Sequence, residues 1–170
     1  MPKQFRKAGE LPPCAHCGQP ARKTTGEEIY LNHPDLADRI MYACDPCKAY
    51  VGAHKTNGAA LGRPANAELR KARQALHDRM FDPLWENAPE TGGYTPEDQV
   101  ARKRIQNAAR ARCYGFLGAR MNLAPEHVHI AEFDIEQCRE AWRLLKGVTY
   151  PQIRDWSKAH KRAADKGEAA

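Results

Sequence analysis

The residues whose chemistry is clearest are cysteines in two Cys-x-x-Cys pairs, Cys14 with Cys17 and Cys44 with Cys47. Two residues between cysteines let both sulfurs of one turn reach a single ion at about 2.3 Å. Two such pairs supply the four thiolates of a tetrahedral zinc site. Because four protein ligands leave no position for water, we expect one structural Zn²⁺ ion. The alternative is two disulfides or free thiols.

The surroundings of these cysteines favour a metal over disulfides. The segment from Met1 to Lys7 lacks the apolar stretch of a secretory signal, and no run approaches the ~20 apolar residues that span a bilayer. We therefore expect a cytoplasmic protein without a membrane partner, in a compartment that keeps thiols reduced. The remaining cysteines, Cys113 and Cys138, fall on apolar faces of predicted helices, which indicates small buried side chains.

The elements that position the cysteines predict an α+β fold, a treble-clef-like zinc finger packed on a mostly helical C-terminal half. Gly and Pro each occur twelve times, so the core is expected to be modest and a metal would help to stabilise it. The expected parts of the finger are a knuckle at 14–18, hairpin strands at 22–25 and 28–31, a strand at 39–43, a helix from Cys44 to Gly52 and an irregular loop at 52–65.

The whole chain is predicted to comprise a flexible basic arm at 1–13, a zinc-finger domain with its following helix at 14–85, a linker at 86–95 and a helical region at 96–166. Asn66 is a good N-cap for a helix at 67–80, and Thr95-Pro96 begins one that runs to about Met121. Residues 128–130 are expected to be a short strand or an extended link. Two further helices are predicted at about 135–146 and 151–166.

The charge pattern favours a polyanionic partner. The net charge is +6 and the isoelectric point is about 9.1, and basic helices can neutralise phosphates. The alternative is a pair of solvated helix faces, and Tyr50, Trp85 and Tyr94 do not interleave with the cations as a single-strand stacking site would require. The candidate nucleic-acid-binding residues are Arg70, Lys71, Arg73, Arg102, Lys103, Arg104, Arg110 and Arg112.

Three histidines invite comparison with His-Asn-His nucleases, which also use a treble clef with paired cysteines. His33 lies near the position of their general base, and His54 or His77 could be a second metal ligand. However, the expected hairpin lacks an Asp-His pair, and Lys48 follows Cys47 where such enzymes place a histidine. We therefore expect no catalytic residues and no enzyme activity, with a divergent nuclease kept as an alternative.

Four blocks of the sequence are informative together. They are Cys14-Ala-His-Cys17-Gly, Tyr42-Ala-Cys44-Asp-Pro-Cys47-Lys-Ala-Tyr50-Val-Gly52-Ala-His54, Glu68-Leu-Arg70 through Phe81-Asp-Pro-Leu-Trp85, and Tyr114-Gly-Phe-Leu-Gly118 with His129-Ile130. With these blocks the chain resembles the small zinc-finger-containing proteins of undefined function that occur mostly in bacteriophages and prophages. The resemblance covers roughly residues 14–145 and departs at Ala60, where the family usually has proline. It implies zinc at the four cysteines, a phage or prophage origin and hence a bacterial host cell.

The sequence therefore predicts a zinc-stabilised, non-enzymatic protein that binds DNA or a host nucleic-acid-handling protein through its basic face. A second hypothesis is a protein-interaction module that inhibits a host enzyme, in which zinc only maintains the shape. The divergent nuclease is the third. The oligomeric state is not predicted.

Overall fold

In the computed structural model, residue 7 and residues 9–165 are described, with side chains up to Arg162. The chain divides into two compact units. The finger unit is the chain up to Arg73 together with His129–Glu136, and the helical unit is Gln74–Val128 with the chain from Gln137 onward. Lys3 and Arg6 of the predicted arm, and the end of the last predicted helix at Lys166, lie outside the described residues. The predicted domain boundary at 86–95 stays a prediction.

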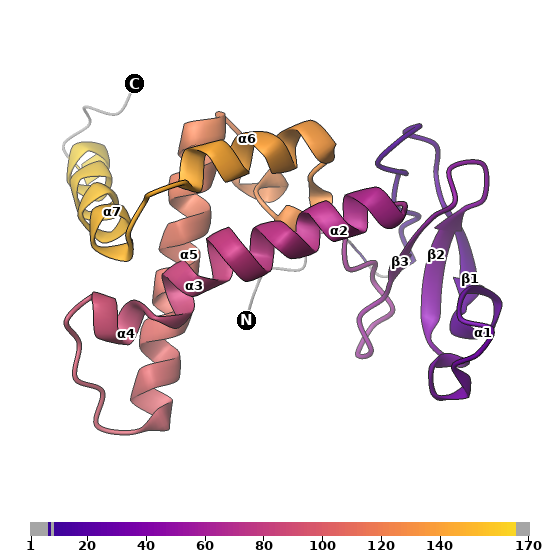
Figure 1. Cartoon of the computed structure of the whole chain (residues 1–170), viewed down its shortest axis with the longest axis horizontal. Helices are drawn as coiled ribbons and strands as arrows, with labels where there is room; N and C mark the ends of the chain where they lie inside the picture. The colour runs from indigo at the N-terminus through magenta and orange to yellow at the C-terminus, as the bar shows by residue number, and fades with distance from the viewer. Residues whose placement is uncertain (1–6, 8, 166–170) are drawn as a thin grey trace. The chain divides into compact units, whose positions relative to one another are not determined.

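The finger unit contains a three-stranded antiparallel sheet in the order β1-β2-β3, with β2 in the centre (Figure 1). Its strands are β1 (Arg22–Thr25), β2 (Ile40–Cys44) and β3 (Ala49–Gly52). In the register, Arg22 faces Ala43 and Cys44 faces Ala49. The predictions of strands at 22–25 and 39–43 are therefore confirmed.

The predicted second hairpin strand at 28–31 is wrong, because the chain forms helix α1 (Gly26–Ile29) there. A short 3₁₀ turn, η1 (Pro34–Leu36), follows it. The amide of Gly26 donates to the carbonyl oxygen of Arg39 at 2.8 Å, and a Cβ at Gly26 would lie 1.8 Å from the carbonyl oxygen of Leu36. The chain turns away at Gly26, where its backbone lies close to that of Leu36. Strand β1 therefore pairs with β2, and not with residues 28–31 as predicted.

The predicted helix from Cys44 to Gly52 is also wrong, because a turn and strand β3 occupy this stretch. Lys48 adopts a left-handed conformation with φ of 48°, which interrupts a right-handed helix. Tyr50 and Val51 then pair with β2, as aromatic and β-branched residues favour. The α+β class is confirmed, but the finger lacks the helix of a treble clef. Each cysteine pair lies instead at the turn of an antiparallel pair.

Part of the core of the finger unit is built mostly from alanine. One cluster of buried residues consists of Ala21, Tyr42, Ala53 and Ala60, with Val51 packed against it. The hydroxyl of Tyr42 donates to the carbonyl oxygen of Gly58 at 2.8 Å, so its polar end is satisfied. Alanine side chains bury little apolar surface, and small domains of this kind depend on metals or other cross-links.

Helix α2 (Ala67–Leu76) begins at the predicted cap, since Oδ1 of Asn66 accepts from the amide of Leu69 at 2.9 Å. It continues as a π-helical segment, η2 (His77–Phe81), and then as α3 (Asp82–Glu86). Pro83 lacks an amide hydrogen, and its ring would clash with the carbonyl four residues earlier in a regular helix. The wider π turn before Pro83 relieves this clash.

The helical unit contains α4 (Ala88–Thr91) and α5 (Gln99–Met121), and α7 (Tyr150–Asp165) is its last described helix. The stretch predicted as a linker at 86–95 is therefore partly helical. Helix α5 begins later than predicted, because the cap is Asp98, whose Oδ1 accepts from the amide of Ala101 at 2.7 Å. Two short 3₁₀ turns follow α5, η3 (Pro125–His127) and η4 (Ile130–Glu132), so the stretch predicted as a strand or link at 128–130 leads into a 3₁₀ turn. Helix α6 (Ile135–Leu145) agrees with its prediction.

The helical unit has a buried core of its own. Phe81, Ala109, Leu117 and Ile153 are all fully buried. Cys113 and Cys138 are buried as predicted, and burial raises the pKa of the Cys113 thiol to about 12, so this thiol stays protonated. None of the helices in the described ranges is long and apolar enough to cross a membrane.

Candidate metal centre

The four cysteines of the two pairs come together in the finger unit. Their sulfur atoms all lie within 4.8 Å of one another, and Sγ of Cys17 lies 3.6 Å from Sγ of Cys44. A tetrahedron with Zn–S bonds of about 2.3 Å has sulfur–sulfur edges of roughly 3.8 Å. The side chains present therefore fit one zinc ion. The prediction of a single four-cysteine zinc site at Cys14, Cys17, Cys44 and Cys47 is confirmed, and zinc supplies there a structural cross-link between two turns.

Both turns hold their sulfurs by backbone geometry. In the first, the amide of Cys14 donates to the carbonyl oxygen of Gln19 at 2.8 Å, and the amide of His16 points to Sγ of Cys14 at 3.4 Å. Gly18 has a positive φ of 73°, which glycine adopts without steric cost. In the second turn, Lys48 occupies the corresponding left-handed position, where an L side chain is unfavourable.

The electrostatics of the cluster favour a cation. A hydrogen bond from the backbone of Gln19, followed by one from the Cys47 thiol, lowers the pKa of Cys17 to about 7. The hydrogen bond with Cys17 raises the pKa of Cys47 to about 12, because a second negative charge so close is unfavourable. Burial raises the pKa of Cys44 as well. Four thiolates can therefore coexist here only with a positive ion among them, which zinc provides.

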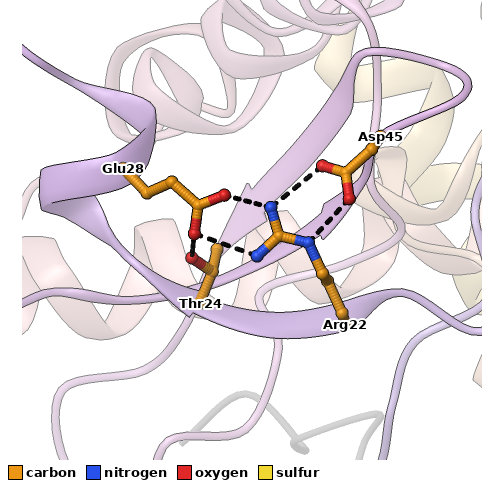
Figure 2. A network of polar contacts seen from close by, with 4 residues as sticks. All are labelled: Arg22, Thr24, Glu28 and Asp45. Carbon is orange, nitrogen blue, oxygen red and sulfur yellow. Dashed lines mark hydrogen bonds and ion pairs between the residues drawn. The ribbon is translucent and has the colours of Figure 1, made fainter.

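An arginine clamp connects the second turn to β1 and α1. Arg22 lies between the carboxylates of Glu28 and Asp45, and Thr24 also contacts Glu28 (Figure 2). Nε of Arg22 donates to Oδ2 of Asp45 at 2.7 Å, and its Nη1 donates to Oε2 of Glu28 at 2.9 Å. The Arg22 guanidinium lowers the pKa of Glu28 to about 2 and also lowers that of Asp45. Because Asp45 is the neighbour of Cys44, the clamp fixes the position of a ligand-bearing turn.

Two further arginines support the first turn. Nη2 of Arg63 donates to the carbonyl oxygen of Cys14 at 3.0 Å. Arg73 is only 8% exposed; its Nη1 donates to the carbonyl oxygen of Arg63 at 2.8 Å, and its Nε to that of Phe133 at 2.8 Å. The guanidinium of Arg73 is therefore buried and bonded to backbone carbonyl oxygens, and its predicted contact with phosphate stays a prediction. No pattern in the sequence indicates that the carbonyl oxygens of Cys14, Arg63 and Phe133 accept hydrogen bonds from these two arginines.

The other candidates on α2 differ in their availability. The guanidinium of Arg70 lies 3.9 Å from the centroid of the Tyr50 ring, and its Nη1 donates to the carbonyl oxygen of Ala65 at 2.6 Å. These contacts attach the start of α2 to β3. Lys71 is exposed. Of the three α2 candidates, Lys71 is therefore the one whose charge is fully presented to solvent.

The basic candidates on α5 differ in how far their charges are exposed to solvent. Lys103 and Arg104 are exposed. Arg102 is paired with Oε1 of Glu90 at 2.6 Å, which also lowers the pKa of that carboxyl. The guanidinium of Arg110 lies 5.3 Å from the Trp85 ring, and Nη1 of Arg112 donates to the hydroxyl of Tyr150 at 2.7 Å. The exposed positions are thus concentrated near the start of the helix.

The three histidines of the nuclease hypothesis occupy different environments. His33 is exposed, with Nδ1 at 4.0 Å from Oδ1 of Asp35. His54 lines a pocket of about 260 Å³ in the finger unit. In the helical unit, Nδ1 of His77 lies 3.1 Å from Oδ1 of Asp82. Within the described part of the chain, the four cysteines are the only group of three or more His, Cys, Asp or Glu side chains placed to share one metal ion.

The chain matches the model of one known protein family. The model of the zinc-finger-containing domain family DUF3268 matches residues 11–148, which is more than half of the chain and includes all four zinc ligands. No curated protein and no solved structure matches the chain. The extent of the family match and the tetracysteine cluster agree with each other, and the chain belongs to this family of zinc-finger-containing domains.

Proposed function

We propose that this zinc-finger protein binds duplex DNA without catalysing a reaction, through the exposed cations of α5. The observation that carries the proposal is the charge of that helix. Its 23 residues include six arginines and lysines and no acidic residue. Within the described residues, no carboxylate pairs with Lys103 or Arg104, so both charges are available to phosphates. Helix cations of this kind supply the sequence-independent part of DNA affinity.

The zinc ion has a structural role in this proposal. Four thiolates complete its coordination, so no position is left for a reacting water or substrate. The non-enzymatic assignment rests on this closed ligand set. The ion determines whether the finger unit folds, since apparent binding energies in zinc fingers are on the order of 10–16 kcal/mol.

The remaining basic candidates are expected to contribute less to DNA binding than Lys103 and Arg104. Arg102, Arg110 and Arg112 each have a contact within the helical unit, so they would position α5 and reinforce its positive field. Lys71 and Arg70 would make accessory contacts from α2. Arg73 takes no part, because its guanidinium is buried and bonded to carbonyl oxygens.

The cellular setting belongs to the same proposal. We infer a phage or prophage protein that acts in the cytoplasm of a bacterial host, where reduced thiols can retain zinc. In that setting the chain would bind DNA itself or a host protein that handles nucleic acid. A module that only inhibits a host enzyme is the alternative that the following test distinguishes.

The test is fluorescence anisotropy with a labelled duplex over a salt series. Each phosphate contact contributes about 0.9 to the slope of log K against log salt concentration. Replacing Lys103 and Arg104 together by glutamine is expected to lower the magnitude of this slope by about 1–2. The charge-matched control is Lys23→Gln with Lys55→Gln, which removes two exposed cations from the finger unit and is expected to leave the slope unchanged.

Two results would contradict the proposal. A wild-type protein that shows no duplex binding at low salt would leave only the protein-interaction module. An equal loss of slope in both double variants would mean that net charge, and not α5, governs the binding. Cleavage of plasmid DNA with Mg²⁺ that is lost in His33→Ala or His54→Ala would replace the proposal with the nuclease.

A further inference from the structure

A groove lies between α5 and α7 in the helical unit. Its volume is about 380 Å³, and its lining includes Ala111, Arg112 and Gly115 of α5 with Trp156, His160 and Lys161 of α7. Ligand pockets in proteins begin at about 300 Å³, so this volume suits one small planar group with a charged attachment. Arg112 is the residue that the groove shares with the basic stretch of α5.

The α5 side of the groove is formed by small residues. A Cβ placed on Gly115 would meet no atom within 4 Å, so open space lies above this position. Ala111, one helical turn earlier, is exposed. A flat group can therefore approach the helix backbone closely here, which larger side chains would prevent.

The α7 side is aromatic. The rings of Trp156 and His160 are stacked, with centroids 4.9 Å apart and planes at 20°. Phe116 contacts Trp156 edge-on at 5.3 Å, which fixes the orientation of the indole. The imidazole of His160 is exposed, so a third planar ring can extend the stack.

The charge around the groove is positive. Nη1 of Arg112 is held by the hydroxyl of Tyr150 at 2.7 Å, which orients the rest of its guanidinium. Lys161 is exposed on the facing helix. Asp155 is the single acid among residues 150–162 of α7, and it is paired with Arg154 at 3.1 Å. An anion such as a phosphate therefore meets two cations here and no free carboxylate from this part of α7.

From these contacts we propose that the groove binds one unpaired nucleotide of a nucleic-acid strand. Its base stacks on the Trp156–His160 pair, and its phosphate lies between Arg112 and Lys161. Base stacking on aromatic side chains, combined with cations along the backbone, is the usual way in which single strands are bound. This site rests on the proposed function and adds a preference for single-stranded segments or overhangs to the duplex contacts of Lys103 and Arg104.

The test compares two probes by fluorescence anisotropy, an oligothymidylate of about twelve nucleotides and a blunt duplex of about twenty base pairs. Gly115→Met places a side chain in the groove, and methionine is a better helix former than glycine, so folding is preserved. Ala108→Met is the matched control, because Ala108 is exposed on the same helix and does not line the groove. We expect Gly115→Met to weaken oligothymidylate binding about tenfold or more, as loss of one stacked base does.

The same proteins distinguish every outcome. Duplex binding is expected to stay within about twofold in Gly115→Met, and oligothymidylate is expected to quench tryptophan emission in the wild type but far less in Trp156→Phe. If the duplex binds but Gly115→Met leaves oligothymidylate binding unchanged, or weakens it no more than Ala108→Met does, the groove proposal is overturned and the proposed function stands. If neither probe binds at low salt, both proposals are overturned.

Discussion

Arg73 in α2 donates hydrogen bonds from both Nε and Nη2 to the carbonyl oxygen of Phe133, sixty positions later in the chain, at 2.8 and 2.6 Å. Nη1 of the same guanidinium donates to the carbonyl oxygen of Arg63, and Arg63 in turn donates to that of Cys14. One buried arginine thus joins the segment His129–Glu136 to the first zinc turn, all within the finger unit. Its guanidinium is thus bonded to backbone carbonyl oxygens of two separate segments.

Replacing Arg73 is therefore expected to destabilise the protein. Arg73→Lys keeps the charge but cannot donate to two carbonyl oxygens at once in the same fork geometry, and we expect a loss of about 2–4 kcal/mol in the free energy of unfolding. Urea denaturation followed by circular dichroism measures this loss. Lys71→Ala, an exposed change on the same helix, is expected to stay within about 0.5 kcal/mol of the wild type. Equal stability of Arg73→Lys and the wild type would contradict the structural role.

The arginine clamp predicts a change in zinc affinity. Arg22→Gln removes the hydrogen bonds that hold Asp45 beside Cys44, and losing an outer partner of a ligand-bearing turn is expected to weaken zinc binding about 10–100-fold. Competition with a chromophoric chelator measures the affinity. Lys23→Gln removes the neighbouring positive charge, which has no contact with Asp45, and serves as the control. A loss of the same size in both variants would assign the effect to net charge.

The left-handed lysine predicts a stabilising substitution. Lys48 has φ of 48°, a conformation that glycine adopts without the steric cost of a Cβ. Lys48→Gly is therefore expected to raise the free energy of unfolding by up to about 1 kcal/mol, whereas Lys55→Gly, at an exposed position, serves as the control for the loss of a lysine. Thermal denaturation in the presence of zinc is the measurement. A lower midpoint for Lys48→Gly would show that its side chain has a role that the structure does not explain.

The helical unit has its own pH-sensitive contact. Burial alone would raise the pKa of Asp82, but hydrogen bonds from His77 and Trp85 outweigh it and lower the pKa below its ordinary 3.8. A carboxylate whose pKa is lowered by folding stabilises the protein fully above the ordinary value and loses this effect as the pH falls through the lowered value. Asp82→Ala is therefore expected to cost about 1–2 kcal/mol near neutral pH.

In strong acid the difference between Asp82→Ala and the wild type is expected to shrink. Urea denaturation followed by tryptophan emission, at about pH 7 and at about pH 3, measures both values. Asp78→Ala removes an exposed acid from the same π-helical segment and is expected to have little effect at either pH. A cost for Asp82→Ala that is the same at both pH values would contradict the role of its ionised form.

The zinc ligands and most helices could be predicted because their signals are local. The spacing of Cys14, Cys17, Cys44 and Cys47 alone indicates a tetrahedral site, and the Asn66 cap fixes the start of α2. Between the two cysteine pairs, prediction was less successful. Gly26 brings the chain against the carbonyl oxygen of Leu36, and this approach of distant backbone has no pattern in the sequence.

The second cysteine pair shows how tertiary pairing overrides a local signal. The sequence predicted a helix from Cys44 to Gly52, since proline, here Pro46, is tolerated in the first turn of a helix. The pairing of Tyr50 and Val51 with β2, together with the left-handed Lys48, makes this stretch a strand. Likewise, Arg73 resembled its exposed neighbours in sequence, and only its burial against the carbonyl oxygen of Phe133 reveals its role. Trp156 and His160 stood too far from Arg112 in sequence to be recognised as its neighbours.

We propose that zinc stabilises the fold of this protein and that α5 binds duplex DNA. Hydrogen–deuterium exchange of the zinc-loaded protein, with and without duplex DNA, tests this claim most directly. We predict that DNA slows exchange in α5 around Lys103 and Arg104 and leaves the turns at Cys14–Cys17 and Cys44–Cys47 unchanged. Slower exchange at the two cysteine turns, with none along α5, would contradict the account.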